Sequence, residues 1–374
     1  MNPYGEILPP LTVFLTVWAA VYLLSKAFRL ERFGVEVKPF LLIFRTGRFN
    51  RMLDWLAGRL GRAVPALSNL SLAMSLGMMA LGTYLLTRNL YSLFYRVKEA
   101  APVFPAIPFI TIRESLPYFL LAAVVLIAVH EIAHGVVARY EGIKVKSSGV
   151  LVAAIIPGGF VEPDEEEFKR AERGKRLRVL AAGSTANMAL ALLLIPLLLA
   201  FFHPSGVLVE GVWDGGPAMQ AGIKPGMIIE AVGGVNVSSV QDLSQQISKA
   251  GINADLTLRV RLPDGSLKTF HVRTVADPDN PSRPIIGLTK VRNHIPHFQV
   301  YLALFWLHFW SLNIAIFNML PLYPLDGDGI AYNLAEKFLG GRAKIIRVGL
   351  TLFYLTLLGL NIGLTFGRFG FISI

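Results

Sequence analysis

Two histidines and a glutamate inside a long apolar run have the spacing of a metal-binding helix. The string is His130-Glu131-Ile132-Ala133-His134, within the apolar run Pro117–Ala138. Histidines four residues apart project from one helical face, so both imidazoles can reach one metal ion. The glutamate between them can take a proton from a water molecule at that metal. The pattern predicts zinc-dependent hydrolysis, and its apolar flanks predict that the chemistry takes place in a membrane.

A catalytic zinc site needs three protein ligands and one open position, so a third side chain must reach the same depth. His134 stands five residues before Arg139, roughly 8 Å from the end of the apolar run at the helical rise. The run Asn318–Gly329 offers two carboxylates, Asp326 and Asp328, where two prolines end a helix. The third ligand is therefore expected from this broken segment.

Together these segments resemble the site-2 proteases, a family of intramembrane zinc metalloproteases. That family pairs a helical His-Glu-x-x-His with a distant Asn-x-x-Pro-x-x-Pro-x-Asp-Gly stretch, and the second motif is present here as Asn318–Gly327. The resemblance implies that one zinc ion is bound by His130, His134 and Asp326. It also implies that Glu131 is the catalytic acid and base.

Further residues follow from the same resemblance. Gly183-Ser184-Thr185-Ala186-Asn187 looks like the family's Gly-x-x-x-Asn element. By that match Asn187 would hydrogen-bond substrate or the developing oxyanion, although an intramembrane asparagine is also often a link between helices. Asn318 has the same alternatives, substrate contact or capping of the broken helix. Asp328 stands where the family usually has a second glycine, and Asp326 is the preferred ligand.

Composition places the chain among polytopic membrane proteins. Of its 374 residues 53% are hydrophobic, and the mean hydropathy is +0.53. The predicted fold is a polytopic α-helical membrane protein with about six transmembrane helices and a membrane-associated β-hairpin. The expected spans are Pro9–Phe28, Leu67–Leu86, Pro117–Ala138, Val179–Phe202, Gln299–Leu320 and Val348–Phe366.

Two shorter segments lie beside these spans. Gly149–Glu162 is apolar but too short and too broken to span, and it predicts a hairpin that turns near Pro157-Gly158-Gly159. The hairpin is either structural or offers an edge strand to an unwound substrate. Arg48–Arg62 places apolar residues on one helical face and arginines opposite. This helix either lies on the membrane surface or packs on the other spans.

Residues 205–292 have the turns and alternation of a soluble α+β domain inserted between the fourth and fifth helices. Gly215–Ile229 resembles the strand–turn–helix signature of PDZ domains. PDZ domains capture chain ends by adding a strand to a sheet edge. The candidate peptide-binding residues are Gly206, Val207, Leu208 and Val209. The alternative is a domain that only excludes bulky substrates and binds no peptide.

The expected organisation has four parts. They are residues 1–100, an N-terminal transmembrane region with the amphipathic helix; 101–204, the first part of the catalytic core; 205–292, the PDZ-like domain; and 293–374, the second part of the core. The loops 29–62, 139–178 and 337–347 hold most of the lysines and arginines. The positive-inside rule puts these loops in the cytoplasm of a cell-membrane protein. The metal site then lies near the cytoplasmic side, and the PDZ-like domain is extracytoplasmic.

The expected function is regulated intramembrane proteolysis of transmembrane protein substrates, after a first cut by another protease, with the PDZ-like domain gating or selecting substrate. The net charge of +11 comes from basic residues beside apolar runs. A lipid bilayer is therefore an expected partner, and nucleic acid is not. There is no cysteine, which excludes disulfides and thiolate metal sites. The alternative is a catalytically inactive membrane scaffold with a peptide-binding PDZ domain.

Overall fold

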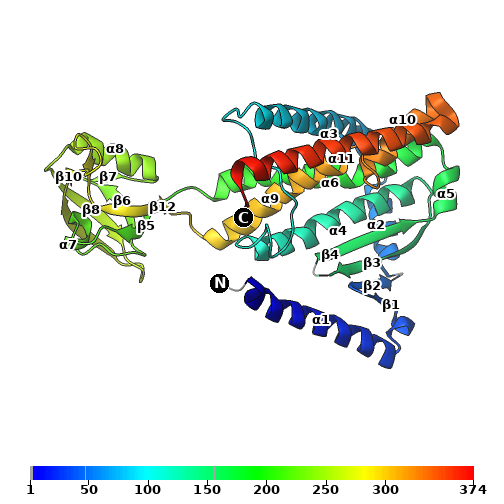
Figure 1. Cartoon of the computed structure of the whole chain (residues 1–374), viewed down its shortest axis with the longest axis horizontal. Coiled ribbons are helices and arrows are strands. Elements are labelled where there is room, and N and C mark those ends of the chain that lie inside the picture. Colours follow the sequence, from blue (N-terminus) through cyan, green and yellow to red (C-terminus); the bar gives the residue numbers. More distant parts are fainter. Residues whose placement is uncertain (1–2, 47, 155) are drawn as a thin grey trace. The chain divides into compact units, whose positions relative to one another are not determined.

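The chain forms two compact units in a computed structural model that describes residues 3–46, 48–154 and 156–374. The first unit is Met1–Leu194 together with Phe305–Ile374, and the second is Ile195–Leu304. Long apolar helices and a four-stranded sheet make up the first unit, and a six-stranded sheet makes up most of the second (Figure 1). The second unit encloses the segment expected to be an inserted domain.

Five helical segments among the described residues are long and apolar enough to cross a membrane. They are α3 (Ala63–Phe94), α4 (Leu116–Tyr140), α6 (Arg173–Phe201), α9 (Phe298–Asn318) and the stretch Asp326–Phe369, which contains α10 (Asp326–Leu339), a 3-10 turn (Gly340–Arg342) and α11 (Ala343–Phe369). The first expected span lies in α1 (Pro3–Ala27), whose apolar part Thr12–Ala27 is shorter. The polytopic helical class is supported, and the total of six spans stays a prediction.

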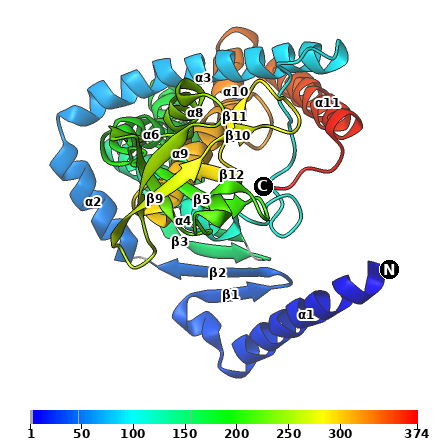
Figure 2. The ribbon, with the colours of Figure 1, turned by 90° about the vertical axis from the view of Figure 1, so that its left-hand side faces the viewer.

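A four-stranded antiparallel sheet lies against α4 (Figure 2). Its strands are β1 (Val35–Lys38), β2 (Leu41–Thr46), β3 (Val145–Ala153) and β4 (Ile156–Pro163), paired in that order. The last two are the expected hairpin. The first two were missed, although their β-branched and aromatic residues favour strands, because they are short and lie in an arginine-rich loop. The sheet order leaves β4 at one edge, on the side of α4.

The hairpin turns at a different place from the one expected. The last paired residues of β3 and β4 are Ala153 and Ile156, and Ala154 is a turn residue. The expected turn residues Pro157-Gly158-Gly159 lie inside β4. A Cβ on Gly159 would lie 3.2 Å from Ile127 Cγ2 of α4. Glycine is therefore favoured there by the close approach of strand and helix, and not by a chain turn.

The amphipathic segment forms α2 (Arg48–Leu60), and it packs on the protein. Leu53 is fully buried, and a Cβ on Gly135 of α4 would lie 2.7 Å from its Cδ1. Arg139 at the end of α4 adds an ion pair of 3.2 Å with Asp54. Of the two arrangements that the sequence left open, α2 adopts the one packed against another span.

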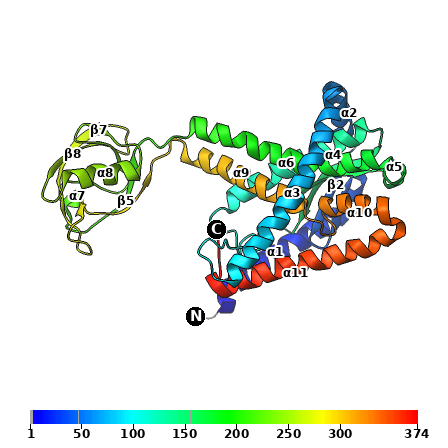
Figure 3. The same cartoon turned by 90° about the horizontal axis from the view of Figure 1, so that it is seen from above.

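Helix α3 packs against α11 (Figure 3), and polar side chains join the two helices. The hydroxyls of Thr83 and Tyr354 lie 2.6 Å apart, and the amide of Asn89 donates to Asn361 Oδ1 over 3.0 Å. Asn361 is fully buried. Hydrogen bonds between apolar helices hold their relative rotation, so α3 and α11 form one packed layer.

The second unit has the strands and helices expected of a PDZ-like domain. Its strands are β5 (Val207–Val212), β6 (Ile228–Val232), β7 (Val235–Asn236), β8 (Asp255–Arg261), β9 (Leu267–Arg273), β10 (Val275–Ala276), β11 (Pro284–Ile285) and β12 (Leu288–Asn293), and its helices are α7 (Pro217–Gln220) and α8 (Val240–Ala250). The main sheet has the order β12-β5-β6-β8-β9, with β7 on β6. Ser239 and Asp242 cap α8 reciprocally. The core is made of buried valine, leucine and isoleucine from strands and α8.

The residues expected to bind peptide lie in the interior of this sheet. Val207 and Leu208 pair with β6 on one side and with β12 on the other. The backbone N–H of Gly206 donates to Ser238, and Val209 is fully buried. A strand that is already paired on both sides cannot accept another, so the structure does not support this assignment. The free edge beside β5 belongs to β12 instead.

Candidate metal centre

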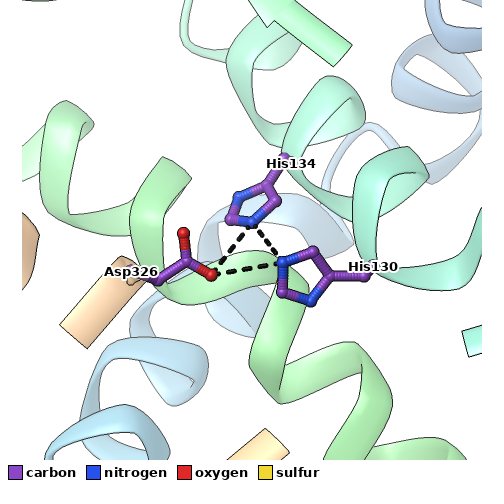
Figure 4. Close-up of side chains that lie close together, drawn as sticks. All are labelled: His130, His134 and Asp326. Carbon is purple, nitrogen blue, oxygen red and sulfur yellow. Dashed lines mark hydrogen bonds and ion pairs between the residues drawn. The ribbon is translucent and has the colours of Figure 1, made fainter. Parts of the chain in front are cut away.

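Helix α4 places its two histidines side by side, facing the same carboxylate. It begins after Ser115 with a proline in its first turn and ends at Tyr140, so the apolar run is one uninterrupted helix. His130 and His134 lie one turn apart and point toward Asp326 from α10 (Figure 4). The side chains of all three residues are mostly buried, with exposed fractions of 11%, 12% and 19%. The structure thus brings together the three residues that the sequence predicted as ligands.

The ligand atoms of this cluster form a compact triangle. Asp326 Oδ2 lies 3.2 Å from His130 Nε2 and 3.3 Å from His134 Nε2, and the two Nε2 atoms are 3.0 Å apart. Two ligands of a tetrahedral zinc ion with bonds of about 2.0–2.1 Å are separated by roughly 3.3 Å. The donor set, two imidazoles and one carboxylate, and its spacing therefore fit a zinc ion with a fourth position left open.

Asp326 reaches the histidines because the chain folds back sharply after α9. A Cβ on Gly327 would lie 2.2 Å from the carbonyl oxygen of Met319, so only glycine fits at this approach. Asp328, the other carboxylate in the motif, is buried and forms a two-pronged ion pair with Arg347 of α11. The tertiary structure therefore presents Asp326, and not Asp328, to the histidines.

Helix α6 supplies an outer partner to each of the three. His134 Nδ1 lies 2.6 Å from the carbonyl oxygen of Val179, which holds the ring with Nε2 toward the cluster. The hydroxyl of Ser184 donates to Asp326 Oδ2 over 3.4 Å, and Asn187 Nδ2 lies 3.4 Å from His130 Nδ1. Val179 and Ser184 were not predicted as site residues. A backbone carbonyl leaves no signal in the sequence, whereas Ser184 stood inside the quoted Gly-x-x-x-Asn element.

Gly183 lets α6 approach the cluster. A Cβ at this position would lie 2.3 Å from His134 Nε2 and 2.7 Å from two ring atoms of His130. Any larger residue would have to displace the imidazoles. This close approach explains why glycine begins the Gly183–Asn187 element in physical terms.

The two asparagines singled out from the sequence both lie at His130. Asn318 Nδ2 is 3.4 Å from His130 Nε2, at the end of α9. Asn187 is fully buried, and among the residues that the structure describes its Oδ1 has no hydrogen-bond partner. Both amides can therefore contact a group that enters beside the histidines.

Glu131 lies at the wall of a cavity next to the cluster. The cavity measures about 330 Å³ and is also lined by Val161 of β4 and by Phe168 of α5 (Glu165–Arg170). Glu131 Oε2 accepts a hydrogen bond of 2.8 Å from the backbone N–H of Val161. A carboxylate in this place can exchange a proton with a water molecule in the cavity.

The profile of peptidase family M50 matches residues 118–360, from the start of α4 into α11. The chain belongs to this family. That stretch contains every residue of the cluster formed by His130, His134 and Asp326. The predicted site-2 protease family is confirmed, and M50 membership together with the apolar helices makes the chain an integral membrane protein.

Relatives of this M50 member support the class. An uncharacterized protein of Methanocaldococcus jannaschii is 30% identical over 210 residues, 56% of this chain and 54% of that protein. The membrane-bound transcription factor site-2 protease homolog of Arabidopsis thaliana is 30% identical over 132 residues, 33% of this chain and 26% of its own length. Zinc metalloprotease Rip1 of Mycobacterium tuberculosis is 30% identical over 183 residues, 35% and 45% of the two chains. The matched part of the chain thus covers about half or less of the length of each of these relatives.

The second unit of this M50 member has its own structural likeness. The PDZ domain of an SdrC-like protein from Listeria monocytogenes is 22% identical, covers 23% of this chain and 86% of that domain, and gives a TM-score of 0.21. The PDZ-like description of the unit is based on its motif, Gly215–Ile229, and on its own strand order.

Proposed function

We propose that this chain is an intramembrane zinc protease that hydrolyses peptide bonds within or near transmembrane segments of membrane proteins. The observation that carries the proposal is the triangle of ligand atoms from His130, His134 and Asp326, beside Glu131 and a cavity, among apolar helices of an M50 member. Buried ionisable groups among such helices are expensive and are kept for function.

Each residue of the cluster has a role in this proposal. His130, His134 and Asp326 would hold one zinc ion, which when bound polarises a scissile carbonyl and makes water a better nucleophile. Glu131 takes a proton from the attacking water and returns it to the leaving nitrogen. Asn187 Oδ1 lacks a partner among the described residues, so its amide is available to hydrogen-bond the substrate backbone.

Asn318 is the second amide beside the reacting centre. Its Nδ2 lies 3.4 Å from His130 Nε2, at the broken end of α9. An N–H donor held beside the scissile carbonyl stabilises the negative charge that develops on its oxygen. On this proposal Asn318 or Asn187 contributes that donor.

A helical substrate must unwind before it is cut, because its amides are already hydrogen-bonded. The outer edge of β4 could receive such an extended segment by strand addition. The backbone N–H of Val161 points outward from the sheet edge and donates to Glu131. The backbone N–H of Gly159, two residues earlier in the strand, points to the same side. Pro157 and Pro163 have no N–H to offer. At this edge the N–H of Gly159 would be offered to a substrate, next to the N–H of Val161, which is bonded to the proposed catalytic carboxylate.

The second unit would gate or select substrates through the edge of β12, which lies beside α8. PDZ domains bind chain ends by adding a strand next to such a helix. A substrate that another protease has already cut presents a new chain end of this kind. On this proposal the domain holds trimmed substrates or excludes bulky ones.

The positive-inside rule gives the proposed orientation in the cell membrane. On this proposal the metal site faces the cytoplasmic side, and the PDZ-like unit lies outside.

The test uses purified full-length protein in detergent with a panel of membrane-helix substrates. Cleavage is expected, is lost on chelation and returns with zinc. Glu131→Gln should keep its zinc and cleave roughly 100-fold more slowly or worse, because general acid–base catalysis contributes about 10²–10⁴-fold. Unchanged turnover in Glu131→Gln would refute the assigned role. Peptide binding with no cleavage of any substrate would instead support an inactive scaffold.

A further inference from the structure

Asp328, which is buried, and Arg347, which is partly exposed, form an ion pair beside the proposed metal centre. Arg347 Nε donates to Asp328 Oδ1 over 2.9 Å, and Nη2 donates to Oδ2. The Asp328 side chain is only 4% exposed, and Arg347 is 34% exposed. Asp328 follows Asp326 by two residues in α10, whereas Arg347 comes from the start of α11. The pair therefore links the segment that carries Asp326 to a second helix.

Two tyrosines enclose the same guanidinium. The Arg347 Cζ atom lies 4.6 Å from the ring centroid of Tyr323 and 5.0 Å from that of Tyr332. Tyr323 precedes Asp326 in the broken segment, and Tyr332 follows it in α10. One planar cation therefore contacts the chain on both sides of Asp326 through two hydrogen bonds and two ring faces.

The helix that carries Arg347 is itself fixed. Tyr354, two turns further along α11, contacts Thr83 of α3 through its hydroxyl at 2.6 Å, and Asn361 contacts Asn89. Arg347 thus connects the folded-back segment to the packed layer of α3 and α11. Gly327 lies between Asp326 and Asp328 and has no side chain to restrict the segment.

The charge of Arg347 also neutralises Asp328. Asp328 is a carboxylate two residues from Asp326, and an unpaired carboxylate so close would compete for the same cation. Arg347 occupies both of its oxygens with a charge that is permanent. Asp326 is then the one carboxylate of the motif that is left facing the histidines.

We propose that Arg347 is a positioning residue of the metal centre, which fixes Asp326 toward His130 and His134 and keeps Asp328 away from the ion. This inference rests on the proposed zinc site. Arg347 acts through Asp328 and the two tyrosines and touches neither substrate nor metal. Groups that hold metal ligands from behind typically change metal affinity by about 10–100-fold when they are removed.

The experiment measures the zinc dissociation constant of the full-length protein in detergent by competition with a chromophoric chelator. Arg347→Met is expected to weaken zinc binding roughly 10–100-fold. Arg347→Lys keeps the charge but loses the fork and the stacking, so its affinity should fall between those of Arg347→Met and wild type. Asp326→Asn should bind zinc most weakly of all.

Arg176→Met is the matched control. Arg176 of α6 also pairs with α10, through Glu336 at 3.3 Å, and its side chain is 16% exposed, but this contact is at the far end of α10. Zinc affinity should stay close to wild type in this variant. The melting temperature of each zinc-free protein reports whether a variant is folded, and the charge-free pair Asp328→Asn/Arg347→Gln replaces Arg347→Met if that protein does not fold.

Three results would overturn the proposal or its basis. Wild-type affinity in a folded Arg347→Met protein would overturn the positioning role. An equal loss in Arg176→Met would show general support of α10 and would also overturn it. A wild-type protein that binds no zinc at all would instead overturn the proposed function on which this inference depends.

Discussion

The carboxylate of Glu131 accepts a hydrogen bond of 2.8 Å from the backbone N–H of Val161. This contact joins α4, which carries the proposed proton carrier, to β4, the strand at the edge of the four-stranded sheet. An extended substrate on that edge would use the same row of donors. If substrates bind at this edge as proposed, substrate binding and the orientation of Glu131 would be coupled through the N–H of Val161.

Val161→Pro removes this N–H and should slow cleavage roughly tenfold or more, since a hydrogen bond to a charged group contributes about 1.5–3 kcal/mol. Cleavage rate and zinc content are measured on the same preparation. Val161→Ala keeps the N–H and is expected to cleave at close to the wild-type rate. Equal rates in the two variants would show that the hydrogen bond does not orient Glu131.

Gly183→Ala should weaken zinc binding by about tenfold or more, because the new Cβ would lie 2.3 Å from His134 Nε2 and push the imidazole away. Gly174→Ala in the first turn of the same helix meets only the end of Arg178 at 3.4 Å and should bind zinc as the wild type does. The measurement is the zinc dissociation constant. Identical constants in both variants would argue against the close approach of α6.

Leu53→Ala should lower the free energy of unfolding by about 2–5 kcal/mol, because a fully buried leucine leaves a cavity against α4. Leu60→Ala in the same helix removes a side chain that is 42% exposed and should change stability by about 0.5 kcal/mol or less. Reversible unfolding in mixed detergents measures both. Similar small losses in the two variants would favour a helix that lies only on the lipid surface.

Zinc should raise the melting temperature of the metal-free protein, because a ligand that binds only the folded state stabilises it. At 100 times the dissociation constant the gain is about 2.7 kcal/mol. His134→Ala should abolish this shift. His308→Ala should retain it, since His308 Nδ1 lies 2.8 Å from the Ala191 carbonyl oxygen and belongs to no ligand cluster among the described residues. A shift that survives in His134→Ala would place the zinc elsewhere.

The local patterns of the sequence were sufficient to predict five long apolar helices and to place two of the proposed metal ligands on one of them. Residues spaced as His130 and His134 lie on the same face of any α-helix, and the apolar flanks predict that a helix forms there. The PDZ-like unit was recognised in the same way, because its turn glycines and strand alternation are properties of adjacent residues. Such features depend on the periodicity of one element and need no knowledge of its neighbours.

The tertiary structure decided everything that depends on two elements meeting. The family resemblance already preferred Asp326 over Asp328 as the proposed ligand, but only the structure shows that Asp328 is paired with Arg347 of α11 while Asp326 faces the histidines. The sequence predicted a turn at Gly159, whereas in the structure this residue lies in β4 and packs against α4. In the second unit β12 and β9 are the edge strands of the main sheet, and the expected residues 206–209 lie at or in the inner strand β5, because the sheet order depends on pairing between distant strands. Local periodicity carries no information on such contacts, since they are set by how separate elements pack.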